Sequence, residues 1–452
     1  MSLAAFGLEM GGALAAAETT PQTKSARAAE LVASAEKGWP QFRGARRDGV
    51  SDERGLLQAW PESGPKVLWT ADGAGNGYSS PIVAGGKIFV TGDVDGTLWV
   101  VAYDLQGNQL WRMKHGDAWL NQYQGARASV TFSEGHLYLQ NAHGRVACFV
   151  AETGKEVWAV NVLERFRSEN ITWGIAECLA VDERAVYVTP GGPETLVAAL
   201  DKRTGEVLWK TEALKAAEGK VDGPGYAAPI LVRFEGRRLL IGASSGHLYC
   251  VDLEGRRIAW SRPRPTNYGV LAMSPVLAGD GIFMTAPFGP PGEMVRLVAP
   301  KGSGGNESGK EKENVSGKGN GSVSVEPVWT TKLDTAQGGV VYAEGRLYGS
   351  YYPRRGGWAA LDAKTGKVLY EAPDFVKGAP MWADGRLYAL CEDGWMLLLE
   401  PTATEFTVRG KFRLANARDR NAWAHPVIVE GRMYLRYQGV VTCYEVRVGA
   451  GE

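Results

Sequence analysis

The sequence predicts an all-β fold: an eight-bladed β-propeller of four-stranded antiparallel blades, closed by an N-terminal strand. Three observations support this prediction. Glycine is abundant, at 59 of 452 residues, and glycine-rich turns are typical of short strands in close succession. A short strand with a central aromatic residue or leucine recurs eight times, each time after another apolar strand. The repeat spans about 40–50 residues, which is the period of a propeller blade.

The recurring strand is the second strand of each predicted blade. Its eight copies are KIFVTG from Lys87, HLYLQN from His136, AVYVTP from Ala185, RLLIGA from Arg238, GIFMTA from Gly281, RLYGSY from Arg346, RLYALC from Arg386 and RMYLRY from Arg432. The inner strands before them are YSSPIVA, ARASVTF, WGIAECLAV, YAAPILV, LAMSPVLA, QGGVVYA, KGAPMWA and WAHPVIV.

A hairpin with a fixed turn chemistry follows the second strand, most clearly at Ala199–Trp209. Asp201 accepts backbone N–H bonds in a turn, and Gly205 supplies a positive φ. The strand after the turn alternates its side chains, so Trp209 lies on one face. We expect such a ring to fill the gap between two adjacent sheets.

The last blade lacks an outer strand, because the repeat ends at Val446. Residues 66–70 read as an isolated outer strand with Trp69 in the repeat position. A closed ring removes exposed strand edges. We therefore expect residues 66–70 to pair with residues 440–446, and the propeller to span residues 66–446.

Segments outside the repeat carry separate predictions. Residues 1–20 are small and apolar and form a candidate export signal, although they lack a basic start. Residues 21–65 form an N-terminal arm, and 24–37 have a helix-forming composition. We expect the WPQFRG segment from Trp39, with Asp48 and Gly49, to lie across the propeller surface.

Two further segments have no predicted strand. Residues 301–323 are rich in Gly, Ser, Lys, Glu and Asn, which predicts a flexible loop insertion between the third and fourth strands of blade five. Residues 447–452 are a tail.

Composition excludes several functions. The 50 basic and 50 acidic residues give a formal net charge of zero, so there is no electrostatic case for binding nucleic acid. No apolar run reaches the roughly 18 residues that a membrane-spanning helix needs. We expect no nucleic-acid partner, no transmembrane segment and a monomer.

The chain resembles secreted bacterial propellers with PQQ-like repeats. The Ala199–Trp209 run matches the A-x-D-x-x-T-G-x-x-x-W docking motif of quinoprotein-type propellers, and Ala360–Tyr370 matches it with Tyr in place of Trp. WPQFRG, GYSSPIV and ITWGIAE extend the similarity from about Trp39 to Val446. The resemblance implies either a PQQ-dependent alcohol dehydrogenase or a non-enzymatic scaffold similar to BamB, which supports outer-membrane protein assembly.

The resemblance implies specific features for the enzyme alternative, namely two adjacent cysteines above the quinone and a calcium ion held by Glu, Asn and Asp. The chain has no Cys-Cys pair, no C-x-x-C-H motif and no compact acidic loop, and none of its five histidines pairs at metal-ligand spacing. We therefore expect no catalytic residue, no metal and no cofactor. PQQ with calcium, acting on an alcohol or sugar, remains the alternative.

Loops that lead into the inner strands gather around one mouth of a propeller channel. They carry aromatic residues beside a few polar groups, as binding surfaces do. The candidate ligand- or partner-binding residues are Arg127, Trp173, Glu177, Tyr226, Asn267, Tyr268, Trp423 and His425. Two alternatives stay open: Arg127 and Glu177 could pair with each other, and the aromatic rings could simply pack between blades.

These observations favour a non-catalytic, exported scaffold in the periplasm or outside the cell. It would bind a protein partner or a small ligand, with cell-envelope assembly as one role.

Overall fold

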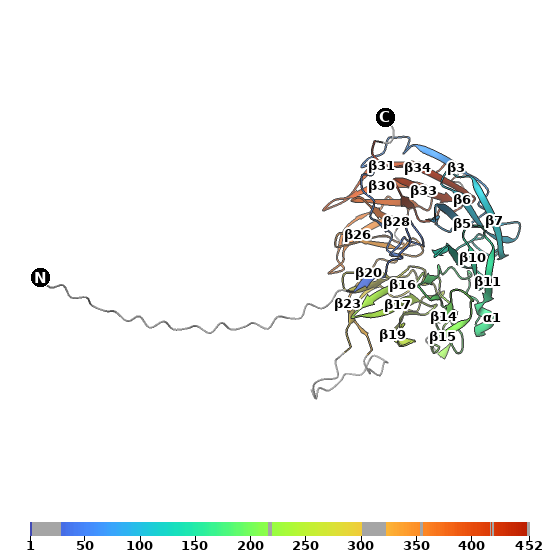
Figure 1. Ribbon diagram of the computed structural model, residues 1–452. Coiled ribbons are helices and arrows are strands. Elements are labelled where there is room, and N and C mark those ends of the chain that lie inside the picture. Colours follow the sequence, from blue (N-terminus) through green and yellow to red (C-terminus); the bar gives the residue numbers. More distant parts are fainter. Residues whose placement is uncertain are drawn as a thin grey trace.

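Eight four-stranded antiparallel blades form a ring in the computed structural model of the chain (Figure 1). This arrangement confirms the predicted eight-bladed β-propeller. The structure describes residue 1 and residues 29–215, 219–300, 322–352, 356–415, 417 and 420–449. Among these, α1 (Val162–Phe166) is the one α-helix, and no helix is long and apolar enough to cross a membrane.

Each blade runs from an inner strand at the channel to an outer strand at the rim. Blade one consists of β4 (Ile82–Ala84), β5 (Lys87–Val94), β6 (Thr97–Asp104) and β7 (Gln109–Asp117), and blade two of β8 (Thr131–Ser133), β9 (His136–Gln140), β10 (Arg145–Val150) and β11 (Glu156–Asn161). Blade three consists of β12 (Ala180–Val181), β13 (Ala185–Val188), β14 (Ala198–Asp201) and β15 (Val207–Lys210). Blade four consists of β16 (Ile230–Phe234), β17 (Arg237–Ala243), β18 (His247–Asp252) and β19 (Arg257–Pro263).

Blades five to eight repeat the pattern. Blade five consists of β20 (Val276–Ala278), β21 (Gly281–Met284), β22 (Gly292–Val298) and β23 (Ser324–Thr331), and blade six of β24 (Val340–Ala343), β25 (Arg346–Ser350), β26 (Trp358–Asp362) and β27 (Val368–Ala372). Blade seven consists of β28 (Gly378–Ala383), β29 (Arg386–Cys391), β30 (Trp395–Pro401) and β31 (Phe406–Arg413). Blade eight consists of β32 (Val427–Val429), β33 (Arg432–Tyr437), β34 (Val440–Glu445) and β3 (Val67–Ala71). All eight predicted second strands are found.

Burial explains why the middle strands are so apolar. A middle strand such as β29 is buried on both faces, because each blade packs between two others. An outer strand such as β15 alternates half-buried and exposed residues. The five cysteines, all of them free, are buried.

The ring closes as the sequence predicts. Strand β3 pairs antiparallel with β34, with Trp69 opposite Cys443 and Thr70 opposite Thr442. Figure 1 shows these two strands side by side near the chain's C-terminus. The first strand of the propeller thus supplies the outer edge of the last blade.

Tryptophans of the outer strands dock on glycine turns of the following blade. The Trp158 ring covers Gly205, where an added Cβ would lie 2.5 Å from the ring and φ is +74°. The indole N–H of Trp158 donates to the carbonyl of Lys202 at 3.0 Å. The same arrangement joins Trp69 to Gly107, Trp111 to Gly154 and Trp329 to Gly366. Only glycine fits beneath these rings, which explains the fixed turn chemistry of the repeat.

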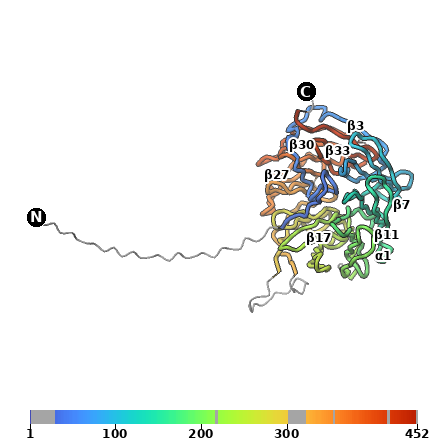
Figure 2. The backbone as a smooth tube through the Cα atoms, in the orientation of Figure 1, coloured from blue at the N-terminus to red at the C-terminus, as the bar shows by residue number. Residues whose placement is uncertain are grey.

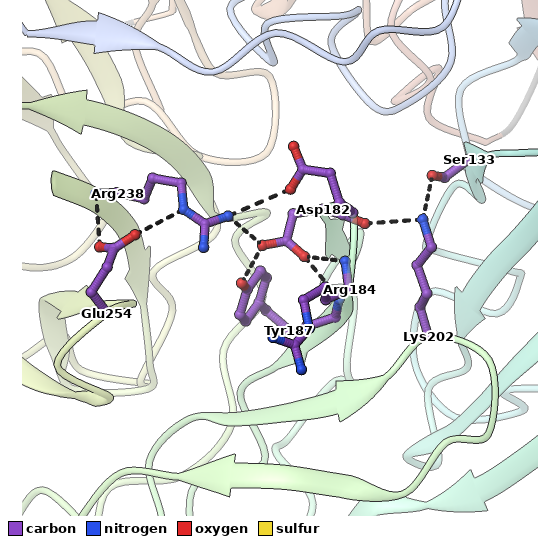
Figure 3. Close-up of polar contacts among 9 residues, drawn as sticks. Ser133, Asp182, Arg184, Tyr187, Lys202, Arg238 and Glu254 are labelled. Atoms are coloured by element: carbon purple, nitrogen blue, oxygen red, sulfur yellow. Dashed lines mark hydrogen bonds and ion pairs between the residues drawn. The ribbon is translucent and has the colours of Figure 1, made fainter. Parts of the chain in front are cut away.

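Polar contacts add a second link between blades (Figure 3). The Asp182 carboxylate of blade three accepts a 2.6 Å bond from the Tyr187 hydroxyl and pairs with Arg238 of blade four at 3.0 Å. Lys202 Nζ donates to the Asp182 carbonyl at 3.2 Å and approaches Ser133 Oγ of blade two at 3.5 Å. These contacts hold three blades in register.

The described part of the N-terminal arm corrects two predictions. Its residues 29–37 form no helix: β1 (Glu30–Leu31) instead pairs antiparallel with β16, opposite Arg233 and Val232. Helix propensity is weak, and the channel edge of an inner strand offers unpaired backbone groups that an extended segment can satisfy.

Contrary to our expectation, the segment from Trp39 to Gly49 also does not lie across the propeller surface but in the channel. Trp39 bridges Val83, the Pro40 carbonyl accepts from Phe132 N–H at 2.8 Å, and β2 (Val50–Ser51) pairs parallel with β28. Figure 2 shows the blue arm in the middle of the ring. It enters the channel because the inner-strand edges of the blades face one another there.

The remaining predicted segments are only partly described. The insertion at 301–323 lies between β22 and β23 as expected; its residues 301–321, and residues 2–20 of the candidate export signal, lie outside the described residues. Val323 is 1% exposed and belongs to the core. In the tail, the N–H of Val448 donates to the Gly55 carbonyl of the arm at 2.9 Å.

Candidate functional site

A cavity of about 340 Å³ opens at one mouth of the channel. The residues that line it come from the arm, from the loops before the inner strands and from the loops after the second strands. Six of the eight predicted residues line it: Arg127, Trp173, Tyr226, Tyr268, Trp423 and His425. Because they belong to five blades, the ring has brought together residues that lie far apart in sequence.

The arm closes the opposite end of the channel. Leu31 pairs with Val232 near the end of β16, and Ser51 pairs with Ala383 at the end of β28. The cavity, in contrast, is lined by residues that precede these strands, such as Tyr226. The channel therefore has one closed end and one aromatic mouth.

Rings in mutual contact surround the mouth. Trp173 lies 6.0 Å from Tyr268 between ring centroids, Tyr268 lies 5.6 Å from Phe288, and Phe288 lies 5.9 Å from Tyr352, all three edge to face. On the other side, Trp423 contacts Tyr78 at 4.7 Å and Tyr123 at 5.3 Å. Tyr123 and Tyr268 are 50% and 57% exposed, so large ring surfaces remain available to an incoming group.

The floor of the cavity is apolar and built from small residues. Phe42 of the arm meets His425 edge to face, beside Ala176, Cys178 and Ala228. Burial, reinforced by the charge of Arg43, lowers the pKa of His425 to about 3. His425 is therefore neutral at physiological pH.

Among the described lining residues, Arg127 is the one that carries a charge, since His425 is neutral. Its guanidinium donates to the carbonyl oxygens of Trp173 at 2.7 Å, Gly125 at 2.6 Å and Gln122 at 3.3 Å. Burial lowers its pKa to about 10, which still leaves it charged at physiological pH.

Glu177 and Asn267 do not line the cavity. Glu177 is 1% exposed, and its carboxylate accepts from the N–H and hydroxyl of Thr189 at 3.1 and 2.8 Å. Burial raises its pKa to about 7. It forms no ion pair with Arg127 among the described side chains, so the expected pairing alternative does not occur. The backbone N–H of Asn267 donates to the carbonyl of Phe288 at 3.2 Å.

Sequence reasoning missed four lining aromatics, Phe42, Tyr78, Phe288 and Tyr352, and left Tyr123 of the loop before Arg127 out of the candidate set. Tyr78 had a usable signal, since it precedes an inner strand in GYSSP as Tyr226 does in GYAAP. Phe288 and Tyr352 follow second strands, whose loops reach the same face. Phe42 was missed because the arm was placed outside the channel.

The residues of the cavity do not fit the calcium–quinone centre of the enzyme alternative. Calcium takes six to eight oxygen ligands, commonly from carboxylates. The described lining residues include no Asp or Glu, and nowhere in the described parts of the chain do three or more His, Cys, Asp or Glu side chains form a group that could hold a metal.

Fold and site together define a propeller of the quinoprotein type whose channel opens into a cavity lined by aromatic residues. Comparison with known families then identifies the chain more closely. It belongs to the family whose model is described as "Outer membrane protein assembly factor BamB", which matches residues 98–289 and 321–405.

The relatives include both outer-membrane assembly factors and quinoprotein dehydrogenases. The chain is 27% identical over 241 residues to the outer membrane protein assembly factor BamB of Shewanella oneidensis, covering 48% of this chain and 55% of that protein. It is 30% identical over 170 residues to the quinoprotein ethanol dehydrogenase of Pseudomonas aeruginosa, covering 34% and 25%. The similarity thus spans about half of the first relative and a quarter of the second.

Solved structures show the same fold. BamB from Moraxella catarrhalis superposes with a TM-score of 0.56 at 13% identity, over 85% of this chain and 99% of that one. The quinohemoprotein alcohol dehydrogenase from Comamonas testosteroni gives 0.60 at 13% identity, over 92% and 81%. Because assembly factors and dehydrogenases share this fold, the function has to be argued from the site.

Proposed function

We propose that this protein is an exported, non-catalytic scaffold of the cell envelope that binds a partner or ligand at the aromatic mouth of its channel. The observation that carries the proposal is the cavity itself. Among the described residues it offers ring surfaces and a single cation, Arg127, and no carboxylate. Aromatic and arginine anchors of this kind commonly provide most of a binding site's affinity.

Membership in the BamB family supports the scaffold role and export to the periplasm. The quinoprotein relatives make oxidation of an alcohol the rival function. The donor set of the cavity argues against that rival, because calcium would lack carboxylate ligands there.

The proposal is tested by photo-crosslinking in the native cell. A photoreactive amino acid replaces Tyr268 at the mouth or, as the control, Leu110, which is 48% exposed on outer strand β7. We expect specific adducts from position 268 in the envelope fraction and none from position 110.

The yield of the same adducts should fall in a Trp173→Ala background, because loss of an anchor ring costs at least about 1 kcal/mol of binding free energy. Equal labelling from both positions, or a protein confined to the cytoplasm, would contradict the proposal.

A further inference from the structure

Four guanidinium groups line or surround the channel without a carboxylate partner. Arg43, Arg47 and Arg436 are 2%, 4% and 0% exposed, and Arg127 lies at the cavity. Among the described residues none of the four forms an ion pair. Such buried charges are normally paired, because removing a cation from water is costly.

Backbone and neutral groups hold these arginines instead. Arg47 donates to the carbonyls of Cys178 at 2.9 Å and Pro229 at 3.2 Å, and to the side chain of Gln41 at 2.9 Å. Arg436 donates to the carbonyls of Gln438 at 2.8 Å and Gly75 at 3.1 Å. Carbonyl dipoles satisfy the N–H groups but leave the net positive charge uncompensated.

Arg43 is the least satisfied of the set. It donates to the carbonyls of Asp48 at 2.8 Å and Val340 at 2.6 Å, while its Nη1 is buried without a hydrogen-bond partner. The charge of Arg43 acts on His425, whose ring lies in the cavity floor. Positive charge therefore lies directly behind the floor as well as in the wall.

Carboxyl groups near the channel offset part of this charge. Glu177 and Asp93 are 1% and 8% exposed, and burial raises their pKa to about 7 and about 6. Near pH 7 Glu177 is thus only partly ionised, whereas Asp93 is mostly ionised. Because the four guanidinium groups have no ion-pair partner among the described residues, we expect a positive potential at the mouth, which would concentrate anions there.

Arg127 has donors left for such an anion. A guanidinium has five N–H donors, and three bonds to carbonyls account for one donor on each of its nitrogens. One N–H remains on each terminal nitrogen, as many as a carboxylate needs for two bonds. The other walls are mostly rings and small apolar side chains, with Gln337 and the tyrosine hydroxyls as neutral polar groups and no second cation among the described lining residues.

We propose that the cavity binds a small organic acid with a flat apolar body and one carboxylate, the carboxylate on Arg127 and the body between the aromatic rings. This assignment rests on the proposed function, since it names the ligand chemistry of the same mouth. A neutral ring compound would lack the ionic contact, and a cation would be repelled.

The test uses three probes with one ring system: 2-naphthoate, 2-naphthalenemethanol and 2-naphthylmethylammonium, titrated calorimetrically into the full-length protein. We expect the anion to bind at least about tenfold more tightly than the alcohol, and the ammonium compound to bind most weakly. Arg127→Gln should bring the affinity for naphthoate close to that for the alcohol and change the affinity for the alcohol less than about twofold.

Matched variants separate charge from folding. Arg203→Gln, on an exposed turn of blade three, should leave all three affinities unchanged, and Arg127→Lys should keep part of the preference for the anion. Tyr268→Ala should lower the affinity for the anion and the affinity for the alcohol by the same factor. Melting temperatures establish that each variant is folded.

Equal affinity for anion and alcohol would overturn the assignment while leaving the mouth as a binding site. Absence of binding by any probe would also overturn it, and the crosslinks from position 268 would then decide the proposed function independently.

Discussion

The ring of Phe42 meets the ring of His425 edge to face, with 4.8 Å between their centroids. Phe42 belongs to the N-terminal arm and His425 to the approach of the last inner strand. Both line the cavity. The arm is therefore part of the site, and substitutions in the arm should change the shape of the cavity at the channel mouth.

Arg47 should be essential for holding the arm in the channel. Arg47→Met would leave the carbonyls of Cys178 and Pro229 without their donor, and we expect a loss of at least about 2 kcal/mol in the free energy of unfolding. Arg46→Met is the matched control: Arg46 pairs with Asp48 and with the exposed Asp52, and should cost no more than about 1 kcal/mol. Urea denaturation measures both, and equal losses would show that Arg47 has no special role.

Trp69 should carry much of the ring closure. It packs against Tyr434 at 6.1 Å between ring centroids, covers Gly107 and donates to the Leu105 carbonyl at 3.0 Å. We expect Trp69→Ala to lower the free energy of unfolding by about 2–3 kcal/mol. Leu68→Ala in the same strand, at a side chain 37% exposed, should change it by less than about 0.5 kcal/mol. A Trp69 variant with the wild-type melting temperature would contradict this view of closure.

Glu177 should make stability depend on pH. Burial raises its folded-state pKa from 4.5 to about 7, so the folded protein binds more protons than the unfolded chain between these values. Stability from this group is therefore present at low pH and lost as pH rises through 7.

Glu177→Gln removes this titration. Relative to the wild type, the variant should gain up to about 3 kcal/mol between pH 4 and pH 8, measured by denaturation at each pH. The exposed Glu62→Gln variant serves as control. A constant difference between the Glu177 variant and the wild type across this range would refute the prediction.

The protein should not retain PQQ. After incubation with PQQ and calcium followed by gel filtration, we expect no stoichiometric quinone spectrum and no dye-linked oxidation of primary alcohols. The physical reason is that the described residues of the lining offer calcium no carboxylate. Co-elution of the quinone with the protein would instead favour the oxidoreductase.

Local patterns made the blades predictable. A strand such as Lys87–Val94 has its own apolar pattern and turn chemistry, so its place in the repeat can be read without knowing its neighbours. Closure followed from the count of strands, because Val67–Ala71 had no other partner.

The arm was not predictable in the same way. Nothing in the local pattern of Glu30–Leu31 specifies β16 as its partner, since pairing depends on which edge the finished ring leaves open. The cavity was partly predictable for a related reason. Cys178 lines it while its neighbour Glu177 does not, and a change of one residue along an extended segment reverses the side-chain direction.

The position of the arm also has a consequence for the order of events during synthesis. The arm leaves the ribosome before any blade, yet its contacts reach Val83 in the first blade, Trp382 in the seventh and Val446 after the eighth. Almost the whole chain must therefore be made before the arm can dock, and such distant contacts slow folding. Until then Phe42 remains without its partner ring, His425. The earliest part of the chain to appear is thus among the last to reach its native place.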